Sequence, residues 1–148
     1  MDHCIVSISE ATELLNRKRL IELATVSNAK NAPANLTGML LYSGGNFFQV
    51  LEGKERTLDI LYNKILLDPR HTKIERLMYC PIRERTFRKW HMGALDLTGK
   101  KPCDRDQFRF ITDQASCDPA AASRAAMTVL KMFRKALPDP NMPDKKAG

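Results

Sequence analysis

Gln49 is the residue whose chemistry stands out first, because it is a carboxamide inside the apolar stretch LTGMLLYSGGNFFQVLEG of residues 36–53. This stretch predicts two strands joined by a turn at residues 43–46. With a strand period of two, Phe47, Gln49 and Leu51 point to the same side. An amide buried without partners costs about 1–3 kcal/mol. We therefore expect a group with matching donors and acceptors to lie against this side of the strand.

The elements that must position Gln49 follow from the apolar spacing around it. Strands are predicted at residues 3–9, 73–82 and 89–97, and amphipathic helices at residues 12–27 and within residues 54–70. A loop at residues 28–34 follows the first helix. The order β-α-β-β-α-β-β indicates an α+β fold, a ferredoxin-like sheet with two helices on one face and one added strand.

The remainder of the chain has a different pattern. Asp118 and Pro119 have the chemistry of an N-cap and a first helical residue, and an apolar stripe from Ala126 to Leu137 follows them. We expect one domain at residues 1–97 and a helical extension at residues 98–137 that packs on the open face of the sheet. Residues 138–148 are expected to form a disordered tail.

Composition and charge exclude several classes of protein. The 148 residues are 43% apolar and have a mean hydropathy of −0.36. No apolar run reaches the roughly 18–20 residues that span a bilayer, and no signal-peptide pattern is seen, so we expect a cytoplasmic protein. The net charge is +7, but the basic residues are dispersed among acidic ones and do not alternate with aromatic residues. This pattern favours a solvated basic surface over a nucleic-acid interface.

No residue pattern predicts a metal site or a catalytic centre. The four cysteines are widely spaced and predict free thiols, and the three histidines form no metal-ligand pattern beside them. The glycine pair at residues 44–45 is not a dinucleotide-binding fingerprint. Because no nucleophile stands with a base and an acid, we expect no enzymatic turnover.

The stretch at residues 36–53 is followed at helix length by DPRH at residues 68–71, and then by ERTFRKWHMG at residues 84–93. These dispersed motifs, in this order and spacing, resemble the BLUF domain, the flavin-binding blue-light sensor. The resemblance covers about residues 3–97. It implies that FAD lies between the two helices packed on the sheet.

The resemblance implies a set of cofactor-binding residues. In the family an Asn and the strand Gln hold the polar edge of the flavin, and they match Asn31 and Gln49. The flavin N5 and C4 carbonyl would then be the partner of the Gln49 amide, which has a donor and an acceptor end. Arg70 and His71 match an Arg-His pair near the cofactor, and Lys30 could contact the flavin C2 carbonyl. From the residues alone, Gln49 could instead bond to the backbone, His71 could be a helix-end residue and Lys30 could be solvated.

The resemblance also implies a photoactive set of residues, with one departure. Trp90 and Met92 match the pair whose exchange near the Gln accompanies signalling, although Met92 could equally be a core residue. The family carries Tyr-x-Ser on its first strand, and the Tyr gives an electron and a proton to the excited flavin. Here Ser7 occupies the Tyr position, and no Tyr precedes Tyr42. Because a serine hydroxyl is not oxidised in this way, and reaches Gln49 only through a water, we expect an impaired or absent photocycle.

Two functions are consistent with these residues. The first is an FAD-binding photoreceptor module that forms homo-oligomers and signals to a separate protein through the sheet face or the C-terminal helix. The second is a flavin-free module, derived from the BLUF family, for protein–protein interaction or regulation. The visible absorption spectrum separates them, because only the first protein would be yellow.

Overall fold

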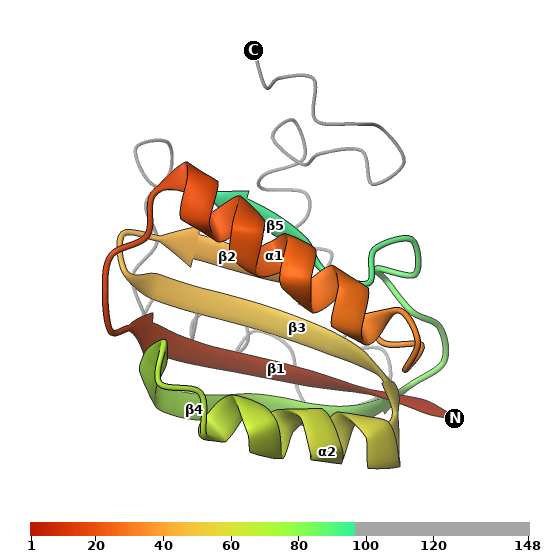
Figure 1. Ribbon diagram of the computed structural model, residues 1–148. Coiled ribbons are helices and arrows are strands. Elements are labelled where there is room, and N and C mark those ends of the chain that lie inside the picture. The colour runs from red at the N-terminus through yellow and green to blue at the C-terminus, as the bar shows by residue number, and fades with distance from the viewer. Residues whose placement is uncertain (97–148) are drawn as a thin grey trace.

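Five strands and two helices build the part of the chain that the structure, a computed structural model, describes, which is residues 1–96. The sheet order is β4-β1-β3-β2-β5, and only the pairing of β2 with β5 is parallel. Figure 1 shows this arrangement. The elements are β1 (Asp2–Ala11), α1 (Arg17–Asn31), β2 (Thr37–Ser43), β3 (Asn46–Lys54), α2 (Glu55–Leu66), β4 (His71–Ile82) and β5 (Gly93–Asp96).

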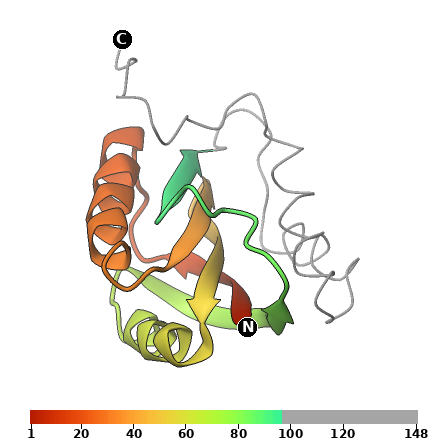
Figure 2. The ribbon, with the colours of Figure 1, turned by 90° about the vertical axis from the view of Figure 1, so that its right-hand side faces the viewer.

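Both helices cover the same face of the sheet, as Figure 2 shows. Leu20 of α1 and Leu58 of α2 pack in one buried cluster with Ile5, Leu40 and Leu51 of the sheet. These three strand residues share one side because alternate residues of a strand point to opposite faces. The predicted order of elements and the placement of two helices on one face are confirmed. The predicted helical extension and tail lie outside the described residues.

Helix α1 is shifted toward the C-terminus relative to the prediction. It begins after Asn16, whose side-chain Oδ1 accepts a hydrogen bond from the backbone N–H of Arg19 at 2.9 Å. This N-cap satisfies an amide that has no partner within the helix. The helix continues to Asn31, so the loop predicted at residues 28–34 is wrong for its first four residues. The last turn of α1 therefore carries Lys30 and Asn31 on a regular backbone.

The turn between β2 and β3 is confirmed at Ser43–Asn46, where Gly44 and Gly45 both have positive φ. Two adjacent residues with positive φ suit the right-handed twist of a two-residue hairpin. Gly38 has a different role in the same hairpin. A Cβ atom on Gly38 would lie 2.1 Å from the carbonyl oxygen of Val50, so only glycine fits between β2 and β3 at that point.

Two further boundaries and one cysteine differ from the predictions. β4 begins at His71, and β5 covers only Gly93–Asp96, so Trp90 and Met92 lie in the connection before β5 rather than in a strand at residues 89–97. Cys4 is a buried free thiol, as predicted, whereas Cys80 is disulfide-bonded, which corrects the expectation of a free thiol there.

Candidate flavin site

A cavity of about 190 Å³ lies between the two helices, above the sheet. Strand residues form its floor, residues of α1 and α2 form its walls, and the turn after α2 closes one end. The lining residues on β1, β2 and β3 are Ser9, Leu40, Phe47 and Gln49. Those on α1 are Leu23, Val26, Ser27, Lys30 and Asn31, and the remaining ones are Leu61, Lys64, Ile65, Asp68, Arg70, His71 and Met92.

All five residues predicted to bind the cofactor line this cavity, namely Lys30, Asn31, Gln49, Arg70 and His71. They come from three segments that are distant in sequence. The helical end of α1 positions Lys30 and Asn31, β3 positions Gln49, and the turn into β4 positions Arg70 and His71. The fold therefore brings together a set of side chains that the sequence alone gives only as separate motifs.

Asn31 and Gln49 contribute the two amide groups of the cavity lining. Asn31 is only 4% exposed, and its Nδ2 donates to the backbone carbonyl of His91 at 2.8 Å. Its Oδ1 makes no hydrogen bond to any residue in the described part of the chain. Within the same range, the half-buried Gln49 amide also has no hydrogen-bond partner. Such groups fit the edge of a heterocycle that alternates donors with acceptors. A ligand of this kind would supply the hydrogen-bond partner that the Gln49 amide is expected to need.

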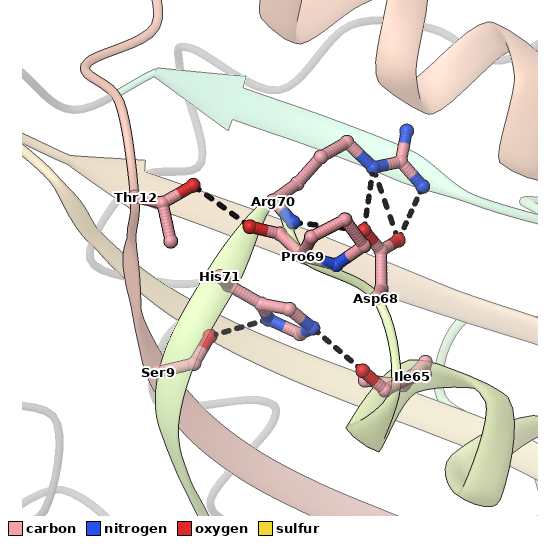
Figure 3. A network of polar contacts seen from close by, with 7 residues as sticks. All are labelled: Ser9, Thr12, Ile65, Asp68, Pro69, Arg70 and His71. Atoms are coloured by element: carbon pink, nitrogen blue, oxygen red, sulfur yellow. Dashed lines mark hydrogen bonds and ion pairs between the residues drawn. The ribbon is translucent and has the colours of Figure 1, made fainter.

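His71 also lines the cavity, and it belongs to the polar network of Figure 3. Its Nε2 lies 2.9 Å from the carbonyl oxygen of Ile65, and its Nδ1 lies 2.9 Å from the hydroxyl of Ser9. A carbonyl only accepts, so Nε2 carries the proton, and Nδ1 of the neutral ring accepts from Ser9. The protein thus uses both ring nitrogens. Toward a ligand His71 offers ring surface, in edge-on contact with Phe47, rather than a hydrogen bond.

Arg70 is oriented by Asp68 in the same turn. Asp68 accepts from the backbone N–H and from the Nε of Arg70, each at 2.9 Å. The hydrogen bond from Arg70 lowers the pKa of the Asp68 carboxyl, and the carboxylate in turn raises the pKa of Arg70. With Lys30 and Lys64, the cavity lining has three cationic side chains and one carboxylate. This excess of positive charge suits an anionic ligand such as a diphosphate.

The four predicted switch residues divide into two groups. Gln49 and Met92 line the cavity, whereas Ser7 and Trp90 do not. Ser7 is 4% exposed and lies directly opposite Gln49 in the pairing of β1 with β3. Trp90 packs near Phe87, with ring centroids 6.2 Å apart, and its indole Nε1 is buried without a hydrogen-bond partner within residues 1–96. The cavity is thus lined by the methionine of the pair and not by the tryptophan.

The connection between β4 and β5 (residues 83–92) is held at its first part by Glu52, which sequence reasoning did not single out. Glu52 is 1% exposed and accepts from the backbone N–H of Thr86 at 2.7 Å, from that of Phe87 at 2.9 Å and from the hydroxyl of Thr37 at 2.9 Å. The Nε of Arg85, in the same connection, donates a hydrogen bond to the carboxylate of Asp2 at 2.9 Å. The sequence pattern that could have identified Glu52 is its place on the same side of the strand as the apolar residues Phe48 and Val50. A carboxylate on a buried side of a strand needs buried hydrogen-bond donors.

The last part of the same connection is held by the end of α1. His91 gives its carbonyl to Asn31, and its ring Nδ1 lies 2.8 Å from the carbonyl oxygen of Leu36. The backbone N–H of Gly38 donates to the carbonyl of Trp90 at 3.0 Å. A side chain of the cavity is therefore bonded directly to the segment that carries Trp90 and Met92.

Within residues 1–96 no cluster of His, Cys, Asp or Glu could hold a metal ion, and no helix is long and apolar enough to cross a membrane. A ferredoxin-like sheet with an amide-edged, cationic cavity between two helices defines an α+β domain with a candidate ligand-binding site. Residues 3–93 match the family described as BLUF, sensors of blue-light using FAD. The chain belongs to the BLUF family. As predicted, the matched region is a sensor module rather than an enzyme, and FAD is the cofactor that defines its family.

Individual relatives agree with this assignment. The chain is 39% identical over 82 residues to the blue light- and temperature-regulated antirepressor BluF of Escherichia coli, a match to 54% of this chain and 20% of that protein. The dark-state structure of the BLUF protein BlrB has a TM-score of 0.60 and 26% identity, over 76% of this chain and 80% of that one. Klebsiella pneumoniae BlrP1 with FMN and cyclic diGMP has a TM-score of 0.61 and 36% identity, over 66% and 26%. Matches span 8% to 20% of the length of the curated relatives.

Proposed function

We propose that this chain is an FAD-dependent sensor module whose light response is impaired by Ser7 and whose output is read by a separate protein. The observation that carries this proposal is the Gln49 amide, which lines the cavity beside Asn31 and has no partner among the described residues. Gln49 and Asn31 would hold the polar edge of the flavin, and Lys30 would add a cation at that edge. Arg70 would face the phosphates, and His71 and Met92 would contact the ring system.

Impairment follows from which side chains surround the cavity. FAD, when bound, would supply blue-light absorption, and an oxidisable side chain of the protein would have to serve as its electron donor. The three tyrosines and the single tryptophan of the chain all lie within the described residues, and none of them lines the cavity. Tyr42 packs against Phe47, which does line the cavity, with the two ring centroids 5.1 Å apart. Ser7 adds a hydroxyl opposite Gln49, which can hydrogen-bond but cannot supply an electron.

Signal output is proposed to pass through the β4–β5 connection. Asn31 would contact the cofactor and is bonded to His91, so a change at the flavin edge can move the segment that carries Trp90 and Met92. A partner protein, or a second copy of this chain, would read that change at the sheet face or at the segment at residues 98–137. A cytoplasmic location is part of the same proposal.

The experiment is reconstitution of the purified chain with FAD, followed by absorption spectra before and after blue light. We expect a yellow protein whose flavin bands resist dialysis, and no lasting red shift after illumination. Gln49→Leu should shift the dark flavin bands, because it removes the amide at the flavin edge, whereas Gln49→Glu should keep an acceptor there. A colourless protein that does not take up FAD would overturn the proposal and favour the flavin-free interaction module. A lasting red shift in the unmodified chain would overturn the role given to Ser7.

A further inference from the structure

We propose that Cys4 and Cys80 form a thiol–disulfide exchange pair, in which the sulfur of Cys4 displaces the original disulfide partner of Cys80. Cys80 is disulfide-bonded, and Cys4 is a free thiol. Cys4 is the only other cysteine within residues 1–96, so the sulfur bonded to Cys80 belongs to a cysteine beyond residue 96. The sequence has two such cysteines, Cys103 and Cys117. This inference does not depend on the binding of flavin.

The two cysteines are placed for direct exchange by the pairing of β1 with β4. Cys4 lies directly opposite Cys80 in this antiparallel pair, on the side of the register shift where the pairing is regular. Directly opposite residues of antiparallel strands have Cα atoms about 4.5–5.5 Å apart. Disulfides join residues whose Cα atoms are about 4.4–6.8 Å apart. A bond between Cys4 and Cys80 therefore fits the sheet without movement of either strand.

The exchange step conserves atoms and electrons. Cys4 gives up its proton, and its thiolate attacks the sulfur of Cys80. The bond between Cys4 and Cys80 forms as the bond from Cys80 to its original partner breaks. The partner sulfur leaves with the electron pair and takes up a proton from water. One disulfide and one thiol are present before and after the step, so no oxidant or reductant is required.

The surroundings of Cys4 control how readily this step occurs. Burial, together with the nearby Glu52 carboxylate, raises the pKa of the Cys4 thiol. Because the thiolate is the attacking species, exchange is slow while the thiol stays buried and protonated. It becomes faster when local opening of the sheet lets water reach Cys4. The pair thus responds to a disturbance of this part of the sheet.

The exchange pair is also next to the residue that holds the β4–β5 connection. Cys4 is paired with Cys80 on one side and with Glu52 on the other, and Glu52 is paired with Thr37. These four residues form one row across four strands. Glu52 is the buried acceptor for the first part of residues 83–92. A change of disulfide at Cys4 therefore alters the packing beside that acceptor.

The exchange suits the cytoplasmic location proposed above. In reducing compartments, disulfides are usually transient or redox-sensing rather than permanent cross-links. Cys4 and Cys80 are 2% and 0% exposed, so a dissolved thiol would have to penetrate the fold to reach the disulfide. The thiol of Cys4 is already in place, and it makes the original disulfide reversible from within the chain.

The test maps the disulfides of the full chain, oxidised in air, before and after incubation at a urea concentration below the unfolding transition. Trypsin sites separate all four cysteines, so each one lies in its own peptide. Alkylation, digestion without reductant and mass spectrometry then identify the linked peptides. We expect the peptide pair of Cys4 and Cys80 to increase while the original pair decreases by the same amount. The number of alkylated thiols should stay constant, because exchange conserves thiols.

Two variants separate exchange between paired strands from general reshuffling. Cys4→Ser should keep the original disulfide of Cys80 throughout the incubation. Val6→Cys in the Cys4→Ser background is the matched control, because it places a buried thiol on the same side of β1 but opposite Met78. Diagonal neighbours in a sheet are about 7–8 Å apart, which is too far for a disulfide, so this thiol should not link to Cys80.

Three results would overturn the inference. The first is a Cys80 that keeps its original partner in every sample of the unmodified chain. The second is an air-oxidised chain in which Cys80 is alkylated as a free thiol. The third is linkage of Cys80 to the thiol introduced by Val6→Cys as extensive as its linkage to Cys4, because reshuffling would then occur in unfolded molecules rather than between paired strands.

Discussion

Ser7 of β1 lies directly opposite Gln49 of β3, and both residues belong to the sheet face that α1 and α2 cover. Directly paired residues in an antiparallel sheet have side chains close together on one face. The register between β1 and β4 shifts between Val6 and Ser7 and again between Ile8 and Glu10, so irregular pairing flanks this position. β-Bulges often lie next to functional sites, where they change the direction of a side chain.

The first prediction concerns this pair. Ser7→Tyr should place a phenol beside Gln49 and give a lasting red shift of the flavin absorption after blue light, which the unmodified chain should lack. The reason is that Tyr, unlike Ser, can give up an electron and also bond to the amide. Light-minus-dark difference spectra at equal flavin occupancy measure the effect.

Ser7→Phe is the matched control for that experiment. It fills the same space with an aromatic ring but has no hydroxyl, so it should show no lasting red shift. A red shift in Ser7→Phe would mean that filling the space, rather than supplying an electron, restores the response.

The second prediction concerns Asn31. Asn31→Ala removes the hydrogen bond to the His91 carbonyl and should lower the free energy of unfolding of the flavin-free chain by about 1 kcal/mol. It should also weaken FAD binding by about tenfold, because the same side chain would hold the flavin edge. Urea denaturation and FAD titration measure the two effects. Asn28→Ala, one turn earlier and outside the cavity lining, should change neither.

The third prediction concerns the buried carboxylate of Glu52. Glu52→Ala leaves the N–H groups of Thr86 and Phe87 without an acceptor and should lower the free energy of unfolding by about 3 kcal/mol. Urea denaturation measures this change. Glu55→Ala, at an exposed carboxylate, should have a much smaller effect. A loss below about 0.5 kcal/mol in Glu52→Ala would contradict the role given to Glu52 in holding residues 83–92.

The fourth prediction concerns acid stability. Hydrogen bonds from Arg85 and Arg70 lower the pKa values of Asp2 and Asp68 below the ordinary 3.8. A carboxyl with a lowered folded-state pKa stabilises the fold above its unfolded-state pKa, and this stabilisation is lost as the pH falls through the folded-state value. Stability should therefore decrease below about pH 4, and the double variant Asp2→Asn, Asp68→Asn should show a shallower decrease.

Urea midpoints measured at intervals from about pH 6 to about pH 2 would check this acid effect. Both pairs are partly exposed, so each should contribute no more than about 1 kcal/mol at neutral pH. An acid profile that is identical in the double variant and the unmodified chain would mean that other carboxyls control acid unfolding.

The sequence by itself determined the order of the elements and the motifs of the site. The alternation of apolar residues defines strands, and the spacing of Leu58, Leu61, Tyr62 and Ile65 defines α2, because these are local patterns that burial of one face imposes. The prediction that Ser7 stands where the BLUF family carries a Tyr likewise rests on the sequence alone. The boundaries of the helices and strands did not follow from the sequence pattern. Helix α1, capped by Asn16, begins and ends later than the predicted helix at residues 12–27, so that Lys30 and Asn31 lie on the helix.

Only the tertiary structure decided which side chains meet. That Met92 and not Trp90 lines the cavity depends on how residues 83–92 are held by Glu52 and Asn31, and those hydrogen bonds join positions that are distant in sequence. The use of both ring nitrogens of His71 by Ser9 and Ile65 depends in the same way on the meeting of β1, α2 and β4. Periodicity records which side of an element is buried, but it does not record which distant group lies against that side.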